Sequence, residues 1–280
     1  MYYTRLPKKG KLTSNSKNAS LDSVRHTRRR LMKGIFDLDG CILGGGNSKE
    51  ERRARFEIGE LIEAQDLDEG LFCSGRGSEY CLAVAKMHGF RRGIAEHGAF
   101  FILDADHDVV IENPMLQNAD RALPVEQFEA FLRRFGGRLY RGKSICLAGY
   151  PPPGMTPREL YERARVEFQN GPGNFTYSDI AVDWTLPDLT KKGSLISFIS
   201  AFARDIHLPD CFGIEDSVVD DSWLGLLANR ISCPANSSEE CKEFVAKNGG
   251  YITKKGFAQG TLEGIKHFIG NWPKYSMTSK

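Results

Sequence analysis

Short apolar runs alternate with stretches of helical periodicity through most of the chain. The runs 35–38, 71–73 and 93–96 have the length of buried strands. Between the first two, the segment 50–66 carries apolar residues at helical spacing, and a second helix pattern extends to about residue 88. This order predicts a mostly parallel sheet, with right-handed crossovers that place helices on its faces.

The rhythm changes near residue 113, after an expected hairpin of 100–103 with 109–111. The following segment predicts a small inserted α/β unit. Its expected elements are a helix at 125–135, a strand around 143–149, a helix opening at the capping box 156–159, and one or two strands within 175–186.

The first rhythm resumes at residue 192 and continues to the last apolar helix face. The expected elements are helices at 192–202, 238–247 and 261–269, with strands at 211–214, near 231 and at 251–253. The predicted fold class is therefore α/β, with a Rossmann-like core and an inserted small α/β unit. The expected boundaries are a tail at 1–33, a core at 34–114 and 188–271, an insertion at 115–187, and a C-terminal tail at 272–280.

Charge is unevenly spread along the chain. Ten Lys or Arg residues and one acid lie within residues 1–33, so this segment carries +9 and the other 247 residues carry −7, for a net charge of +2. The tail is also rich in Ser and Asn, which predicts a solvated, disordered extension. An organelle transit peptide and an anion-binding or nucleic-acid-binding arm are the alternatives. Because the basic charge belongs to the tail, it gives little reason to expect nucleic-acid binding by the folded body.

Composition also indicates the expected cellular compartment. No apolar run approaches the about 18 residues of a membrane span, and no apolar segment near the start resembles a secretory signal. The seven cysteines are scattered without a CxxC pair, which argues against a disulfide framework and a zinc ribbon. These features favour a reducing, cytoplasmic protein. The sequence does not indicate an oligomeric state.

Two carboxylates follow the first strand. Asp37 lies at its carboxyl end and Asp39 two residues later, so both can face one ligand, and Gly40 then lets the chain turn away. Ligands of open α/β sheets bind at the carboxyl ends of the strands. This pair is therefore the strongest candidate for chemistry.

Two further segments suit an anion. Ser74, Gly75 and Arg76 directly follow the second strand and open a helix, where a hydroxyl and backbone N–H groups can hold a phosphate. Lys191 and Lys192 open the helix after the insertion, although lysines normally favour helix C-termini. Either motif alone could be an ordinary helix cap or a solvated surface pair.

An acidic cluster follows the strand at 211–214. Four acids, Glu215, Asp216, Asp220 and Asp221, lie within seven residues. Two carboxylates about 4 Å apart repel by about 4 kcal/mol at an effective dielectric near 20, so gathering them beside Asp37 needs a cation. Carboxylates, waters and a substrate phosphate are a ligand set that suits Mg²⁺.

The four segments occur in the order found in the haloacid dehalogenase superfamily of phosphatases, which this sequence resembles. They are Asp37-Leu38-Asp39-Gly40, Ser74-Gly75-Arg76, Lys192-Gly193, and Asp216 with Asp220. The chain is most similar to the Cof-type or sugar-phosphatase branch, in which a type-IIB α/β cap lies between the second and third motifs. Glu96-His97-Gly98-Ala99 resembles the "NGA" segment of that branch, although His97 alone reads as a loop histidine.

The resemblance implies a role for each of these residues. Asp37 would be the nucleophile that forms an aspartyl-phosphate, and Asp39 the general acid and then base. Asp37, the carbonyl of Asp39, and Asp216 would hold Mg²⁺, with Asp220 as a further ligand or orienting group. Ser74, the Gly75 amide and Lys192 would bind the phosphoryl oxygens, and Arg76 could contact the substrate.

The sequence departs from the family pattern at three positions. Cys41 stands in place of a usual Thr, Glu215 in place of a Gly, and Val219 in place of a frequent Asn. The last two changes add a charge and remove an amide beside the expected metal, and Asp221 could share the role of Asp220. Lys191 is the alternative to Lys192.

The resemblance implies a Mg²⁺-dependent phosphatase acting on a small phosphorylated metabolite, with a sugar phosphate as the expected substrate class. A phosphosugar mutase of the same superfamily is an alternative within enzymes. A non-catalytic module that binds a phosphorylated ligand is the alternative from another class, and the changes at Glu215 and Val219 motivate it.

Overall fold

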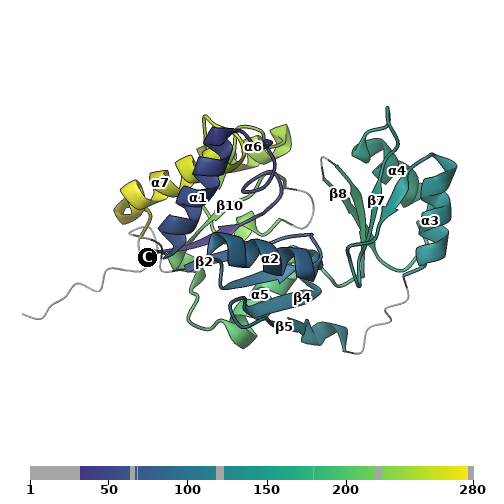
Figure 1. The fold of residues 1–280 in the computed structure, drawn as a ribbon, viewed down its shortest axis with the longest axis horizontal. Helices are drawn as coiled ribbons and strands as arrows, with labels where there is room; N and C mark the ends of the chain where they lie inside the picture. The colour runs from purple at the N-terminus through teal and green to yellow at the C-terminus, as the bar shows by residue number, and fades with distance from the viewer. Residues whose placement is uncertain are drawn as a thin grey trace, which may run out of the picture. The chain divides into compact units, whose positions relative to one another are not determined.

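The structure of the protein, a computed structural model, describes residues 32–63, 67, 69–117, 123–178, 180–218 and 222–276. Two sheets organise these residues (Figure 1). We call residues 125–185, which contain the smaller sheet, the small lobe, and the remaining described residues the large lobe. No helix in the described ranges is both long enough and apolar enough to span a bilayer.

The large lobe is built on an eight-stranded sheet. Its strands, in spatial order, are β12 (Tyr251–Ile252), β11 (Ile231–Cys233), β10 (Cys211–Ile214), β1 (Lys33–Phe36), β2 (Glu69–Cys73), β3 (Arg92–Ala95), β4 (Phe100–Asp104) and β5 (Val109–Glu112). The pairings from β12 to β3 are parallel, and β4 and β5 add an antiparallel hairpin. The predicted α/β class, with its mostly parallel sheet, is confirmed.

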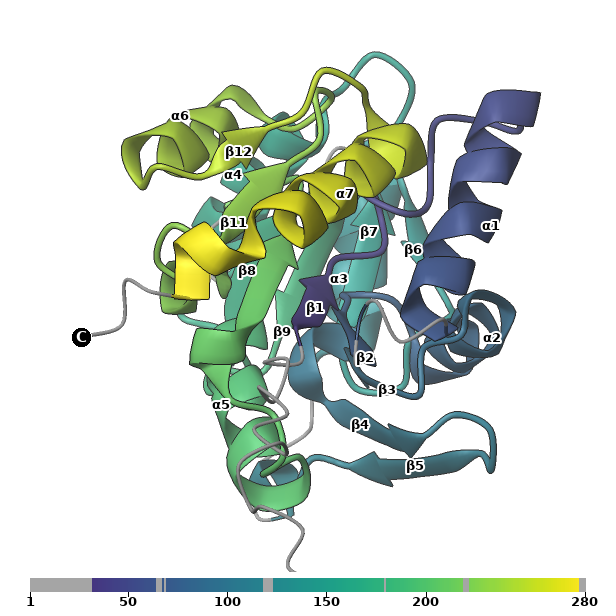
Figure 2. The same ribbon diagram turned by 90° about the vertical axis from the view of Figure 1, so that its left-hand side faces the viewer.

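Helices cover both faces of this sheet. The helices of the large lobe are α1 (Lys49–Glu63), α2 (Ser78–His88), α5 (Lys191–Phe202), α6 (Glu239–Lys247) and α7 (Phe257–Ser276). Figure 2 looks onto the face where α7 and α1 lie beside β1. There Phe36 and Phe212 pack with apolar residues of α1, α2 and α7, while Ile35 and Cys211 face the opposite layer, which contains α5 and α6. The alternation of side chains along each strand divides the core in this way.

The small lobe has its own antiparallel sheet and core. Its elements are α3 (Val125–Arg134), β6 (Arg138–Tyr140), β7 (Leu147–Tyr150), α4 (Pro157–Glu167), β8 (Asn174–Tyr177) and β9 (Val182–Thr185), with strand order β6-β7-β9-β8. Phe128 and Phe131 of α3 and Leu160 of α4 pack against Trp184 of β9. The helices therefore cover one face of the sheet, and alternate residues such as Asp183 point to the other.

Several sequence expectations need correction. Strand β6 was not predicted, and the strand expected at 143–149 is confined to β7. Helix α7 starts at residue 257 and continues to residue 276, although 272–280 was expected as a tail, because Trp272 remains buried with the core residues one and two turns before it. Strand β1 begins at Lys33, inside the expected N-terminal tail, of which residues 1–31 lie outside the described ranges. The boundaries of the insertion at 115–187 stay predictions.

Candidate active site

Four adjacent parallel strands end at one edge of the large sheet. They are β10, β1, β2 and β3, and Ile214 of β10 pairs in register with Phe36 of β1. The residues that follow them are Glu215, Asp37, Ser74 and Glu96. The expectation that acids distant in the sequence gather at one edge is therefore met for the described part of the acidic cluster.

Asp37 and Lys191 form an ion pair at this edge, in which Asp37 is buried and Lys191 is half-buried. Lys191 Nζ donates to Asp37 Oδ2 over 2.7 Å and lies 3.5 Å from Oε1 of Glu215. The other oxygen of Asp37 accepts the Leu38 backbone N–H at 2.7 Å. Burial lowers the pKa of Lys191, but the facing Asp37 and Glu215 carboxylates outweigh it and hold that pKa well above its usual value.

The geometry corrects the choice between the two lysines. Lys192 was expected at the phosphate, yet it is exposed, whereas Lys191 lines the cavity. Thr190 caps helix α5 by accepting the Gly193 N–H at 3.0 Å, so Lys191 is the first helical residue. Successive helical residues differ by about 100° around the axis, and only one of the pair can face Asp37.

Glu215 stands beside the expected metal, at the position where the family pattern has a glycine. It is buried, and Ser222 Oγ donates to its Oε2 at 2.8 Å. Burial raises the pKa of Glu215 to about 8, although Lys191 opposes the shift. Burial, together with the nearby Asp216 and Asp37, also raises the pKa of the Cys41 thiol well above its usual value. Cys41 is therefore a protonated, buried thiol rather than a nucleophile.

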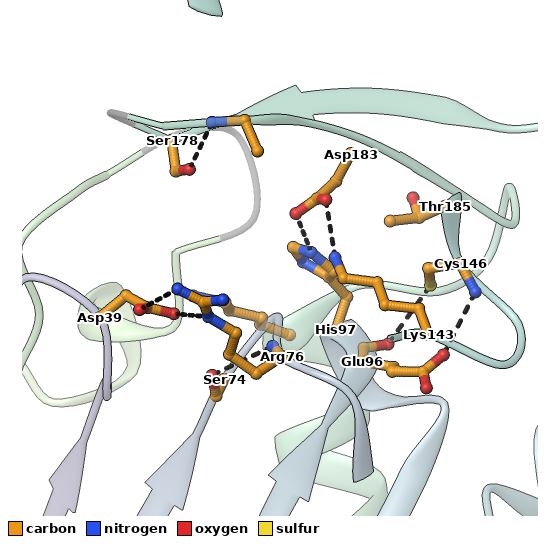
Figure 3. A network of polar contacts seen from close by, with 12 residues as sticks. Asp39, Ser74, Arg76, Glu96, His97, Lys143, Cys146, Ser178, Asp183 and Thr185 are labelled. Atoms are coloured by element: carbon orange, nitrogen blue, oxygen red, sulfur yellow. Dashed lines mark hydrogen bonds and ion pairs between the residues drawn. The ribbon is translucent and has the colours of Figure 1, made fainter. Parts of the chain in front are cut away.

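Asp39 pairs with Arg76 across the site (Figure 3). The guanidinium donates from Nε to Oδ2 at 2.7 Å and from Nη2 to Oδ1 at 2.8 Å. Arg76 also lies over the Tyr80 ring, 5.2 Å from its centroid. The hydrogen bond to Asp39 raises the pKa of Arg76, so the guanidinium stays charged. Both groups line the cavity, and the ion pair can exchange for a phosphorylated ligand.

The loop after β2 has the form of an anion cradle. Ser74 is buried, and its hydroxyl accepts the Arg76 N–H at 3.2 Å. Gly75 lines the cavity, and a Cβ at this position would lie 2.6 Å from Nε2 of His97, so only glycine fits. Gly75 thus lies at the cavity wall, and the backbone N–H groups of this loop are candidates to bind an anion.

Asp216 packs directly on the turn after Asp39. A Cβ at Gly40, where φ is +72°, would lie 1.9 Å from Asp216 Oδ2. Asn236 Nδ2 donates to the Gly40 carbonyl at 3.0 Å, and the Asp216 carbonyl accepts the N–H of Ser238 at 3.0 Å. Asp216 thus shares one small region with the Asp37–Gly40 loop.

Asp220 and Asp221, expected as ligands, lie outside the described residues. Within the described ranges, no group of three or more His, Cys, Asp or Glu side chains is arranged as a metal site. A Mg²⁺ ion held by Asp37, Asp216 and the carbonyl of Asp39 needs only two carboxylates, with water and phosphate completing its shell. Asp37 and Asp216 line the same cavity as oxygen donors, and this donor set fits Mg²⁺.

The site opens into a cavity of about 520 Å³ shared by both lobes. The large lobe supplies Asp37, Asp39 and Lys191, while the small lobe supplies tyrosines and small polar residues. The small-lobe side chains that the cavity contacts include Tyr140, Tyr150, Thr176, Tyr177, Ser178 and Asp183. A mostly apolar, aromatic wall with a few convergent polar groups is typical of a small-molecule site.

Sequence reasoning missed the residues that join the lobes. Nε2 of His97 lies 2.7 Å from Oδ2 of Asp183, and Lys143 Nζ donates to Asp183 Oδ1 at 2.6 Å (Figure 3). Burial alone would raise the pKa of Asp183, but Lys143 and then His97 hold it well below its usual value. One signal was available, because Asp183 is an acid between the core residues Val182 and Trp184.

Comparison with solved structures places this geometry in a known fold. A sucrose-phosphatase from Synechocystis, in complex with sucrose and phosphate, aligns with a TM-score of 0.59 at 14% identity, over 85% of this chain and 98% of that chain. A haloacid dehalogenase-like hydrolase from Bacteroides thetaiotaomicron aligns with a TM-score of 0.56 at 13% identity, over 85% and 99%. This chain has the haloacid dehalogenase fold.

A third solved structure also aligns with this chain over most of its length. The C-terminal domain of C. albicans trehalose-6-phosphate phosphatase aligns with a TM-score of 0.60 at 10% identity, over 86% of this chain and 92% of that domain. No family model and no curated protein matches the sequence. At these identities the haloacid dehalogenase fold is what the comparisons establish, and the activity must be argued from the residues of the site.

Proposed function

We propose that this protein is a Mg²⁺-dependent phosphatase that hydrolyses a small phosphorylated metabolite, most specifically a sugar phosphate, through an aspartyl-phosphate on Asp37. One observation carries the proposal. Asp37, Lys191, the Gly75 loop and Asp216 meet at the carboxyl edge of β10, β1 and β2, where the cavity opens. Phosphoryl transfer depends on positioning and charge neutralisation, and this arrangement offers both.

Asp37 is positioned to act as the nucleophile. Its Oδ1 is held by the Leu38 N–H, its Oδ2 is paired with Lys191, and the residue lines the cavity. A phosphoryl group that enters would meet the Lys191 ammonium and the Gly75 N–H on its oxygens. Asp37 and Asp216, with the Asp39 carbonyl, would hold the Mg²⁺, which when bound neutralises charge on the transferring phosphoryl group.

Asp39 is positioned to move protons. It would protonate the leaving oxygen in the first step and take a proton from water in the second. Arg76 occupies both of its oxygens in this structure. The guanidinium must therefore release at least one oxygen before Asp39 can donate a proton, and a bound phosphate or sugar hydroxyl gives Arg76 an alternative partner.

The small lobe is the proposed cap and source of specificity. Its tyrosines and hydroxyl-bearing residues suit a ligand with both apolar faces and hydroxyl groups. Two of the similar structures are named as phosphatases of sucrose and trehalose phosphates, which supports the choice of sugar phosphates. The reducing, cytoplasmic setting stays a proposal that rests on the scattered cysteines of the sequence.

Release of inorganic phosphate tests this function. The full chain is assayed against p-nitrophenyl phosphate and a panel of mono- and disaccharide phosphates, with Mg²⁺ or with EDTA. We expect Mg²⁺-dependent release that is lost in Asp37→Asn and kept in Asp106→Asn, an exposed acid in the β4–β5 turn. Interconversion of sugar phosphates without release would indicate a mutase. Binding of sugar phosphates without turnover would indicate a non-catalytic module.

A further inference from the structure

Two consecutive residues join the small lobe to the loop that follows β2. Glu96 and His97 form the short 3-10 turn after β3 (Glu96–Gly98), and both have left-handed φ values, +48° and +56°. Such values are uncommon for residues other than glycine and cost conformational energy. Non-glycine residues keep this geometry only where surrounding contacts impose it.

The side chain of Glu96 holds the small lobe. It is fully buried, and its carboxylate accepts backbone N–H groups from three consecutive residues of the segment before β7. The distances are 2.8 Å from Ser144, 2.9 Å from Ile145 and 3.3 Å from Cys146. A carboxylate that accepts several backbone N–H groups forms strong, charge-assisted hydrogen bonds. Glu96 is thus an anchor of the large lobe inside the small lobe (Figure 3).

The side chain of His97 makes a second connection. Lys143 faces one oxygen of Asp183, which favours the ionised carboxylate, and the other oxygen is then an acceptor for a proton on Nε2 of His97. The same His97 ring covers Gly75, where no Cβ would fit beneath it.

The backbone of the same two residues holds the loop after β2. Glu96 N–H donates to the Arg76 carbonyl at 2.8 Å, and His97 N–H donates to the Ser74 carbonyl at 3.2 Å. The small lobe also touches this loop directly, because a Cβ at Gly77 would lie 1.8 Å from the Gly142 carbonyl oxygen. Side chains and backbone of one dipeptide therefore connect the small lobe to residues 74–77.

We propose that Glu96 and His97 are positioning residues that make the shape of the Ser74–Gly77 loop depend on docking of the small lobe. The description of this loop as phosphate-binding rests on the proposed function, whereas the mechanical connection does not. Substrate that fills the cavity between the lobes favours the docked state and so completes the loop. When the small lobe is displaced, His97 loses its contact with Asp183, and the His97 ring and N–H that support the loop are no longer held in place.

Amide hydrogen exchange of the full chain without ligand tests the connection. The variant Asp183→Asn changes one atom in the small lobe and weakens the contact with His97. We expect the amides of Arg76, Glu96 and His97 in the large lobe to exchange about tenfold faster, the factor for losing one charge-assisted hydrogen bond. Glu96→Gln, which replaces an acceptor oxygen by a donor, should do the same. The matched control Glu167→Gln breaks an ion pair with Arg134 inside the small lobe and should leave these amides unchanged.

Inhibition by inorganic phosphate gives a second test, because simple electrostatics and our proposal predict opposite changes in phosphate affinity. Asp183→Asn removes a negative charge from the cavity wall, so electrostatics alone predicts tighter phosphate binding. Our proposal predicts the opposite, a several-fold higher inhibition constant, with a similar rise in His97→Asn, since Asn tolerates the left-handed backbone while lacking the ring.

The outcomes separate the two proposals. Faster exchange confined to residues 143–146 and 182–184, or tighter phosphate binding in Asp183→Asn, would overturn the connection. A wild-type chain that releases no phosphate from any substrate would overturn the proposed function instead, and the exchange experiment would still decide whether the lobes are coupled.

Discussion

Replacement of Lys191 by methionine tests most directly which of the two neighbouring lysines supplies the cation of the site. Met keeps much of the length of the lysine side chain and removes its charge. It leaves Asp37 and Glu215 facing each other without the cation that now lies 2.7 Å and 3.5 Å from them. The neighbouring Lys192 is exposed, and Lys192→Met is therefore a matched control for the loss of one positive charge.

The distances set the size of the expected effect. At an effective dielectric near 20, the attraction of Lys191 to Asp37 is about 6 kcal/mol, before the opposing cost of burial. Glu215 adds less than a full charge would, because burial favours its protonated form. Removal of one partner of a buried pair typically destabilises a protein by about 3–5 kcal/mol. Protonation of Glu215, whose pKa burial already raises to about 8, offsets part of this loss. We therefore expect a destabilisation of about 3 kcal/mol.

Phosphate release under Mg²⁺ is the assay. Loss of one preorganised charge that stabilises a transition state lowers kcat by about 10²- to 10³-fold, and we expect Lys191→Met to fall in that range. Lys191→Arg should keep more activity, because it keeps the charge. Lys192→Met should stay within about threefold of wild type, as for an exposed residue. A larger loss in Lys192→Met than in Lys191→Met, with both variants folded by circular dichroism, would refute the placement of Lys191.

Three further substitutions test other parts of the site. Gly40→Ala places a methyl group 1.9 Å from Asp216 Oδ2, at a position where φ is +72°. Because this displaces an expected Mg²⁺ ligand, the Mg²⁺ concentration for half-maximal activity should rise more than about tenfold. An unchanged Mg²⁺ titration would contradict the role of Asp216. Gly77→Ala inserts a methyl group against the Gly142 carbonyl of the small lobe. Because the small lobe would contact the sugar, kcat/KM should fall more for sugar phosphates than for p-nitrophenyl phosphate. An equal fall for both substrates would contradict specificity through the small lobe. The pKa of Asp183 is lowered by folding, so its contribution to stability is present above the unfolded value near 3.9 and is lost as pH falls. Thermal melting should show Asp183→Asn less stable than wild type at pH 7, with the difference shrinking progressively as pH falls below about 4. A difference that stays constant over this range would exclude this ionisation as the cause.

The arrangement of the large sheet could be predicted because its signals are local and repeated. The apolar runs before Asp37, Ser74 and Glu215 each have the length of a buried strand, and helices between them require parallel pairing. Carboxyl ends of parallel strands share an edge, so the order of the motifs already implied that Asp37 and Asp216 meet.

The choice of lysine could not be settled in the same way. Lys191 and Lys192 are chemically identical neighbours, and which one faces Asp37 depends on the residue at which helix α5 begins. Thr190 and its bond to Gly193 determine that start, and the spacing of a capping threonine three residues before its donor was visible in the sequence.

The connection between the lobes depends on contacts that sequence periodicity does not report. Glu96 reaches residues 48 to 50 positions away, and His97 reaches Asp183 at a separation of 86. Both residues depend on left-handed backbone geometry, which propensity alone would assign to glycine or asparagine. Only the tertiary structure reveals why an acid and a histidine occupy these positions.

Direct detection of the covalent intermediate tests the central claim about Asp37. Enzyme turning over its best substrate is quenched in acid, digested and analysed by mass spectrometry, with Asp37→Asn and Asp106→Asn treated in parallel. Our account predicts a peptide that contains Asp37 and carries one phosphoryl group, in wild type and Asp106→Asn but not in Asp37→Asn. Turnover with the phosphoryl group on any other residue, or turnover that survives in Asp37→Asn, would contradict it.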